Sequence, residues 1–265
     1  MKCCSLFSGI GGFDLAAEWL GWDIIVQCEI DPFCQRVLKH HFPKAILYED
    51  IKKTDFTKHR GDIDIVFGGF PCQPFSTAGK RRGTNDDHHL WPEMLRVIRE
   101  VSPHYIVAEN VSGLISQQQG MVFESVLTDL ENEGYEVQPF IIPACAVGAP
   151  HRRDRVWIIA VDSFHKEAAS NSKSTGQQAR TEGQRKIQSW GRNERTVLSN
   201  YWSNFSTQSP FCDRNDGLSD RLDGITFPSW RRQSIKALGN AIVPQIAYEI
   251  FKMIEQITIS NYENN

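Results

Sequence analysis

Apolar positions in the first 162 residues follow two alternating periods. Short runs rich in Val, Ile and aromatic residues end at Gly, Pro or Asp, whereas longer stretches repeat apolar residues every three or four positions. This pattern predicts strands over 2–7, 23–28, 63–67, 106–108, 135–142 and 156–161, a further short strand before Asp50, and helices over 13–20, 32–41, 92–101 and 122–130. Such alternation predicts an α/β fold with a Rossmann-like, doubly wound, mostly parallel sheet, which binds ligands beyond the carboxyl ends of its strands.

The pattern changes after residue 162. Residues 163–220 are rich in Ser, Asn, Gln, Thr and Arg, with aromatic residues at intervals, which predicts a small irregular second lobe rather than pure disorder. An amphipathic helix is predicted over 241–254, packed back on the first domain. We therefore expect a catalytic and cofactor-binding domain formed by residues 1–162 and 236–260, and a lobe formed by residues 163–235.

Charge and cysteine content narrow the functional class. Residues 1–150 carry 13 Lys and Arg against 20 Asp and Glu, whereas residues 151–236 carry 15 against 9. The basic segment indicates either a polyanion-binding face or a solvated polar insert, and charge alone favours neither. Seven cysteines without CxxC spacing argue against a disulfide framework or structural zinc and fit a reduced, cytoplasmic protein. The apolar run at the N-terminus is too short for a signal peptide or membrane span, so no membrane partner is expected.

A glycine-rich turn follows the first predicted strand, and acidic residues follow the next two. The turn is not the dinucleotide fingerprint, because Asp14 occupies the place of the third glycine in GxGxxG, which disfavours an NAD-dependent dehydrogenase. A carboxylate at Glu29 or Asp31 can accept hydrogen bonds from ribose hydroxyls, and Asp50 with Ile51 suits an adenine ring. Together these features indicate a nucleoside site, and glycines that serve only a tight turn are a serious alternative explanation.

The segment 68–76 places one cysteine, Cys72, in a rigid turn between two glycines and two prolines. An isolated cysteine is more often a small core residue. A Pro-Cys turn after a buried strand packs poorly, however, so we interpret Cys72 as a nucleophile at the ligand edge of the sheet. A free thiol has a pKa of about 8.5, so the site must lower it.

Five segments in order resemble the bacterial and phage DNA (cytosine-5)-methyltransferase family. They are the glycine turn at 7–13, Phe-Pro-Cys-Gln at 70–73, Glu-Asn-Val at 109–111, His-Arg-Arg-Asp-Arg at 151–155 and Leu-Gly-Asn-Ala-Ile-Val-Pro at 238–244. The resemblance covers most of the chain outside about 163–217. It implies the fold of S-adenosylmethionine-dependent methyltransferases, with S-adenosyl-L-methionine as cofactor, double-stranded DNA as partner and, for the cofactor site, Phe7, Ser8, Gly9, Gly11, Gly12, Glu29, Ile30, Asp50, Ile51, Pro71, Leu90, Asn240 and Ala241.

The resemblance also implies a mechanism. Cys72 adds to carbon 6 of a flipped-out cytosine, and Glu109 donates a proton or strong hydrogen bond to ring nitrogen 3. Arg155 binds the cytosine carbonyl oxygen, and Arg153 orients Glu109 or stabilises charge. The alternative is a purely structural role for these residues. Glu109 would then be a carboxylate that caps the end of a strand, and the arginines would form a solvated basic cluster.

DNA contacts are expected from Lys80, Arg81 and Arg82 in a loop that closes over the substrate, and from Arg221. The family's variable target-recognition region is here short and very polar, and the recognised sequence does not follow from it. We expect a monomer, and a cognate restriction system is a candidate partner in the cell. Two alternatives stay open: an RNA cytosine-5 methyltransferase on the same scaffold, and a catalytically silent DNA-binding module.

Overall fold

The computed structural model describes residues 1–71, 90–163 and 227–263 of the chain. Its centre is a seven-stranded sheet in the order β3-β2-β1-β4-β5-β7-β6. The strands are β1 (Lys2–Leu6), β2 (Asp23–Cys28), β3 (Ile46–Tyr48), β4 (Ile65–Gly69), β5 (Tyr105–Val111), β6 (Tyr135–Pro143) and β7 (Asp154–Asp162). The predicted α/β class and mostly parallel sheet are confirmed, and every predicted strand is present, with ends displaced by a few residues.

The strand order reverses beside β1. The chain runs outward from β1 through β2 to β3 and then returns to β4 on the other side of β1, so the switch point lies between β1 and β4. At that junction Gly68 pairs with Leu6, and a Cβ on Gly68 would overlap the Leu6 carbonyl oxygen. Glycine is therefore required where the two strands approach most closely. Ligands of such sheets bind at the carboxyl side of this point.

One strand departs from the parallel arrangement. β7 lies between β5 and β6 and runs antiparallel to both. The start of β7 is consequently paired with the end of β5: Arg155 lies opposite Val111, and Trp157 lies opposite Glu109. This reversal brings the arginine segment and the Glu-Asn-Val segment to the same edge of the sheet.

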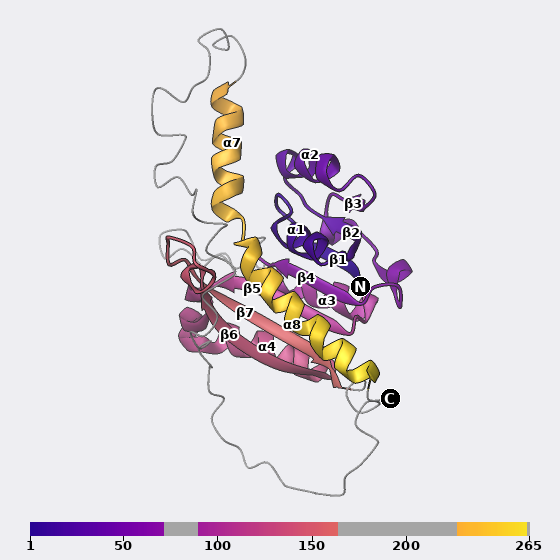
Figure 1. Cartoon of the computed structure of the whole chain (residues 1–265). Coiled ribbons are helices and arrows are strands. Elements are labelled where there is room, and N and C mark those ends of the chain that lie inside the picture. The colour runs from indigo at the N-terminus through magenta and orange to yellow at the C-terminus, as the bar shows by residue number, and fades with distance from the viewer. Residues whose placement is uncertain (72–89, 164–226, 264–265) are drawn as a thin grey trace, which may run out of the picture.

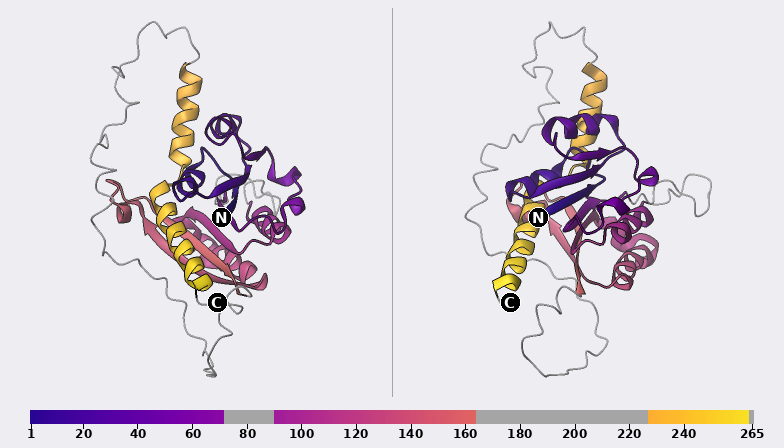
Figure 2. Two further views of the ribbon diagram at one scale, coloured as in Figure 1. Left: turned by 45° about the vertical axis from the view of Figure 1, so that its right-hand side comes forward. Right: turned by 90° about the vertical axis from the view of Figure 1, so that its right-hand side faces the viewer.

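Helices cover both faces of the sheet (Figures 1 and 2). On one face α1 (Gly12–Trp19) and α8 (Pro244–Glu263) enclose a core that includes stacked rings of Phe13 and Phe67, with centroids 5.3 Å apart, and Phe251 against Phe67 at 5.1 Å. On the other face α3 (Trp91–Val101) and α4 (Met121–Asn132) bury aliphatic side chains. A further helix, α2 (Pro32–His41), begins with Pro32 and is capped by the Asp31 carboxylate.

The C-terminal helices differ from the prediction. The helix expected over 241–254 begins instead at Pro244, and a separate helix, α7 (Phe227–Asn240), precedes it. Proline fixes φ and lacks an N–H, so it begins a helix readily, which explains the later start. α7 extends away from the sheet in Figure 1, and its Lys236 forms an ion pair with Asp31 at 3.4 Å. It also crosses the predicted domain boundary at residue 236.

Asp14 is fully buried beneath the first two strands. Its carboxylate accepts hydrogen bonds from Ser5 Oγ at 2.9 Å and from Gln27 Nε2 at 2.7 Å. Burial raises the pKa of Asp14 to about 6, although both hydrogen bonds act in the opposite direction. The residue that interrupts the dinucleotide fingerprint is thus an internal link between α1, β1 and β2.

Relative to wild type, Asp14→Asn should raise the free energy of unfolding more at pH 8 than at pH 4. Below about pH 4 the carboxyl is mostly protonated in both the folded and the unfolded chain. Above pH 6 it is ionised in both, and its burial in the folded chain then lowers the free energy of unfolding. The variant should gain roughly 1–3 kcal/mol of unfolding free energy, relative to wild type, between these pH values. Urea denaturation at both pH values measures this, with the exposed Asp23→Asn as control; an equal difference at both would contradict it.

Within the described residues, no helix is both long and apolar enough to cross a membrane.

Candidate functional site

The glycine turn joins β1 to α1 at the switch point. Phe7, Gly9 and Gly11 all have left-handed backbone, with φ of 52°, 56° and 86°. A Cβ on Gly11 would lie 2.7 Å from the Phe42 ring, whereas a Cβ on Gly9 would meet nothing within 4 Å. Gly11 therefore serves close packing, and Gly9 leaves an open space in which backbone can approach a ligand.

Glu29 ties this turn to the end of β2. Its carboxylate accepts from the Gly9 N–H at 2.7 Å and from the Asp31 N–H at 2.8 Å, and its side chain is largely buried. Both carboxylate oxygens keep a further acceptor site, so Glu29 can also accept from ligand hydroxyls. The next residue, Ile30, has an apolar side chain that is 71% exposed and therefore accessible to a ligand.

Asp50 and Ile51 follow β3 at the same edge of the sheet. Asp50 caps the short helix η1 (Ile51–Lys53) by accepting from the Lys52 N–H at 3.0 Å, and it forms an ion pair with Lys53 at 3.2 Å. Ile51 is buried. An acceptor and an apolar wall are thus present at the carboxyl end of the third strand.

These residues fit the adenosine part of S-adenosylmethionine. The open space at Gly9, the remaining acceptor sites of Glu29 and the exposed Ile30 stand at neighbouring strand ends, where the fold binds ligands. On this fit, Glu29 would hold the ribose, and Asp50 with Ile51 would hold the adenine.

Glu29→Ala and Asp50→Ala should each weaken binding of S-adenosylmethionine by about 1–3 kcal/mol, because each removes a protein carboxylate that accepts a hydrogen bond from the ligand. Calorimetry on the purified variants measures the loss, and Glu18→Ala on the exposed side of α1 is the control. Unchanged affinity in both variants would remove the two residues from the site.

Glu109 and Arg155 form an ion pair at the end of β5. Arg155 Nε lies 3.0 Å from Glu109 Oε1. Burial raises the pKa of Glu109 to about 7, and the positive charges of Arg155 and Arg153 offset only part of that rise. A Cβ on Gly69 would lie 2.9 Å from Glu109 Oε2, so the glycine after β4 leaves room for the carboxyl. The site can hold a proton on Glu109 near neutral pH.

Asn110 connects Glu109 to the chain that leads into Cys72. Its side-chain amide donates to the Phe70 carbonyl at 2.8 Å, and its oxygen accepts from the Val111 N–H. On the far side of the loop, Leu90 N–H donates to the Pro71 carbonyl at 3.3 Å. Asn110 was not predicted as a site residue, although its place after Glu109 in the Glu-Asn-Val segment was a usable signal.

Arg153 contacts the C-terminal motif rather than Glu109 directly. Its Nη2 donates to the carbonyls of Gly239 and Ala241, each at 2.9 Å, and its own backbone is left-handed with φ of 38°. The first of these carbonyls lies near the end of α7, and the second follows it, so the contacts satisfy acceptors that the helix leaves unpaired. Arg153 therefore fixes the junction between α7 and α8.

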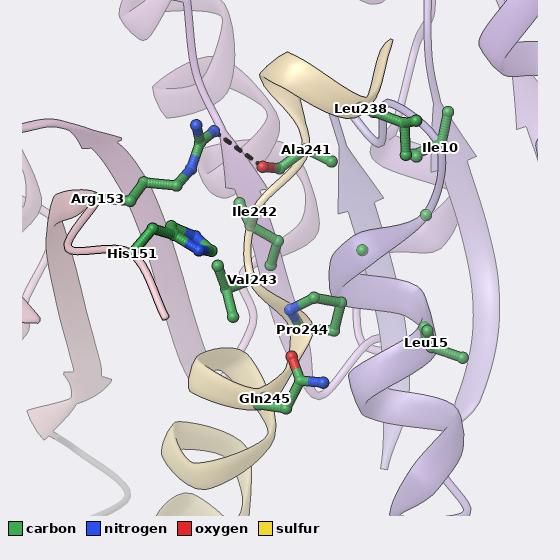
Figure 3. Close-up of a pocket in the computed structure, with 12 residues that line it drawn as sticks. Ile10, Leu15, His151, Arg153, Leu238, Ala241, Ile242, Val243, Pro244 and Gln245 are labelled. Atoms are coloured by element: carbon green, nitrogen blue, oxygen red, sulfur yellow. Dashed lines mark hydrogen bonds between the residues drawn. The ribbon is translucent and has the colours of Figure 1, made fainter. Parts of the chain in front are cut away.

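A cavity of about 420 Å³ opens beside this junction. Figure 3 shows Arg153 and His151 on one side, α1 with Leu15 on the other, and the chain from Ala241 to Gln245 passing between them. Three predicted cofactor residues line it: Gly11, Gly12 and Ala241. His151, Ile242 and Gln245 also line it and were not among the predicted site residues. The cavity joins the glycine turn to the C-terminal motif, which lie over 220 residues apart in sequence.

Several predicted site residues lie outside the described part of the chain. They are Cys72, Lys80, Arg81, Arg82 and Arg221, together with most of the predicted basic lobe. The residues that flank the nucleophile loop are described: Pro71 follows the carboxyl end of β4, and Leu90 precedes the start of α3.

Fold and site together define a Rossmann-like α/β protein with a candidate cofactor site at the carboxyl ends of its strands. The model of the C-5 cytosine-specific DNA methylase family matches residues 1–214. The chain belongs to this family, as the motifs predicted.

Relatives and solved structures agree. Type II methyltransferase M.Eco47II of Escherichia coli is 35% identical over 159 residues, which cover 59% of this chain and 38% of that protein. M.AquIA of Picosynechococcus is 34% identical over 175 residues, which cover 60% of this chain and 71% of that protein. A variant of Spodoptera frugiperda DNMT2 is 26% identical with a TM-score of 0.50, over 60% and 49% of the two chains. S. pombe Dnmt2, at 24% identity and a TM-score of 0.54, shares the fold over 70% of this chain and 58% of its own. The chain spans about four tenths of the length of M.Eco47II and M.PspPI.

Proposed function

We propose that the protein transfers a methyl group from S-adenosylmethionine to carbon 5 of a flipped-out cytosine in a specific double-stranded DNA sequence. The observation that carries the proposal is the buried Glu109, paired with Arg155 and linked through Asn110 to the chain entering Cys72. Membership of the C-5 cytosine-specific DNA methylase family supports the choice of base and position.

Cys72 begins the reaction as a thiolate. Its sulfur forms a bond to carbon 6 of the cytosine, and the electrons of the 5,6 double bond shift toward carbon 5. Carbon 5 becomes nucleophilic in consequence. After the methyl group is accepted, the carbon-5 proton leaves to a base, the double bond reforms and the sulfur departs as thiolate.

Glu109 and Arg155 activate the ring for this addition. Glu109 holds a proton near neutral pH and gives it, or a strong hydrogen bond, to ring nitrogen 3, which withdraws electrons from carbon 6. Arg155, 3.0 Å from the carboxyl, presents its remaining N–H groups to the cytosine carbonyl oxygen. Arg153 contributes positive charge nearby and holds the C-terminal motif in place.

S-adenosylmethionine, when bound, supplies an electrophilic methyl group. The chain's contribution is to bind it, through the glycine turn, Glu29 with Ile30, Asp50 with Ile51, and on the loop and C-terminal sides Pro71, Leu90, Asn240 and Ala241. DNA is held by Lys80, Arg81 and Arg82 and by the lobe with Arg221, through phosphate contacts.

Bisulfite sequencing of host DNA after expression of the chain tests the proposal. Conversion-resistant cytosines at one recurring sequence are expected in cells that express the protein and absent in cells that express Cys72→Ser. A parallel transfer assay on duplex DNA and on tRNA distinguishes the RNA-methylating alternative. DNA without protected cytosines, together with methylated tRNA, would replace the proposal with that alternative.

A further inference from the structure

Arg96 lies outside every segment so far assigned to the site, yet its guanidinium contacts one wall of that site. Arg96 is on α3, and its Nη2 donates to the Ile51 carbonyl at 2.6 Å. Its Nη1 donates to the Thr54 carbonyl at 3.3 Å. Both acceptors belong to the turn that begins with Asp50, so one side chain holds the two ends of η1.

Two glutamates on the same helix face orient the guanidinium. Nε lies 2.9 Å from Glu93 Oε2, and Nη1 lies 2.6 Å from Glu100 Oε1. The other oxygen of Glu100 accepts from the Phe56 N–H at 2.9 Å, which ties the end of the same loop to α3. All three guanidinium nitrogens are therefore used, and the direction of each is set by a partner.

The turn also forms hydrogen bonds within itself. The Asp50 carbonyl accepts from Lys53 N–H and Thr54 Oγ1, and these bonds close the turn on itself. They define its shape but not its position relative to the sheet. The buried Ile51 and the Arg96 contacts supply that position.

The helix that carries Arg96 also lies against the chain that leads into Cys72. The Trp91 ring packs on Phe70 with centroids 5.1 Å apart, and Leu90 N–H donates to Pro71. Trp91 Nε1 donates to Asp129 on α4 at 2.8 Å, which anchors this end of α3. α3 and the residue before it therefore contact both the turn at Asp50 and the residues that lead into Cys72.

We propose that Arg96 is a positioning residue for the adenosine end of the cofactor. It fixes the turn at residues 50–54 so that the Asp50 carboxylate and the Ile51 side chain meet the ligand in a single geometry. The proposal rests on the proposed function, because it assumes that this turn binds the cofactor. A lysine cannot replace arginine here, since a single ammonium group cannot reach four acceptors in fixed directions.

The matched control is Arg99, which is three residues away on the same helix. Its Nη2 also pairs with a glutamate, Glu133, at 2.7 Å, but within the described residues Arg99 forms no hydrogen bond or ion pair with the 50–54 turn. Arg96→Lys and Arg99→Lys thus remove the same chemical group from one helix. A general effect on α3 would appear in both, whereas an effect on the cofactor wall would appear in Arg96→Lys alone.

Calorimetry with S-adenosylhomocysteine and with adenosine, followed by steady-state kinetics, tests the proposal. For Arg96→Lys, affinity for both ligands should fall by about tenfold, the equivalent of one charge-assisted hydrogen bond. The KM for S-adenosylmethionine should rise in proportion, with kcat and the KM for DNA close to wild type. Glu100→Gln, which leaves Arg96 charged but less firmly oriented, should show a smaller loss in the same direction.

The outcomes are distinguishable from failure of the proposed function. If the wild-type protein binds neither ligand, the cofactor assignment itself is wrong. If wild type binds both and Arg96→Lys binds them equally well, Arg96 has no positioning role. A loss in affinity for S-adenosylhomocysteine without any loss for adenosine would also overturn the proposal, because the effect would then lie at the other end of the ligand.

Discussion

Cys72→Ser should abolish methyl transfer while the fold and the binding of S-adenosylmethionine remain. A serine hydroxyl is scarcely ionised at neutral pH and is far less nucleophilic than a thiolate, so addition to carbon 6 does not begin. We expect the rate to fall by at least about 10⁴-fold, a loss typical of removing a catalytic nucleophile. A filter-binding assay with labelled cofactor measures the rate, and calorimetry measures the retained affinity.

Cys145→Ser is the matched control for this experiment. Cys145 is a free, exposed cysteine in the loop between β6 and β7, so its loss removes a thiol without touching the proposed nucleophile. Its activity should equal that of wild type. Methylation by Cys72→Ser at the wild-type rate would show that no covalent step through this residue occurs.

Glu109→Gln should lower kcat by about 10²–10⁴-fold, the range typical of general acid catalysis. The glutamine keeps the shape of the side chain and can donate a hydrogen bond, but it has no proton to transfer. The wild-type pH profile should show the titration of Glu109. Because the acid is active when protonated and burial raises its pKa to about 7, the rate should fall as pH rises through 7. This limb should be absent in the variant.

Values of kcat/KM for DNA measured between pH 5.5 and 9 test both statements, because they report the pKa of the free enzyme, and Glu18→Gln on the exposed face of α1 is the control. The charge of Arg155 changes only the pH at which the rate falls, because it lowers the pKa of Glu109 that burial raises. A wild-type profile that is flat across pH 7, or a Glu109→Gln rate within threefold of wild type, would exclude Glu109 as the acid.

Much of the fold could be predicted because local sequence and local structure agree. β2 and α2 occupy the predicted residues, and the motif segments fall at strand ends where a parallel sheet must bring them together. Gly9 and Glu29 meet for this reason, whereas Glu109 meets Arg155 because β7 runs antiparallel to β5. The sequence pattern is sufficient where a contact follows from strand order and register.

Contacts that depend on packing between distant elements could not be predicted. The antiparallel direction of β7 follows from its insertion between β5 and β6, which no local periodicity specifies. Arg153 meets Gly239 and Ala241 only because α8 returns over the sheet, and Arg96 meets Ile51 across 45 residues. The start of α7 at Phe227 follows a segment of weak periodicity, which led the prediction to miss this helix.

Trapping with 5-fluorocytosine tests the central claim most directly. Fluorine at carbon 5 cannot leave as a proton does, so once the methyl group is accepted the sulfur–carbon bond should persist. Incubation of wild type with S-adenosylmethionine and a duplex that carries 5-fluorocytosine at the methylated position should give a complex stable to denaturation. Peptide mapping by mass spectrometry should place the nucleotide on Cys72. Trapping at another residue, or methylation of normal DNA without any trapped complex, would contradict the account.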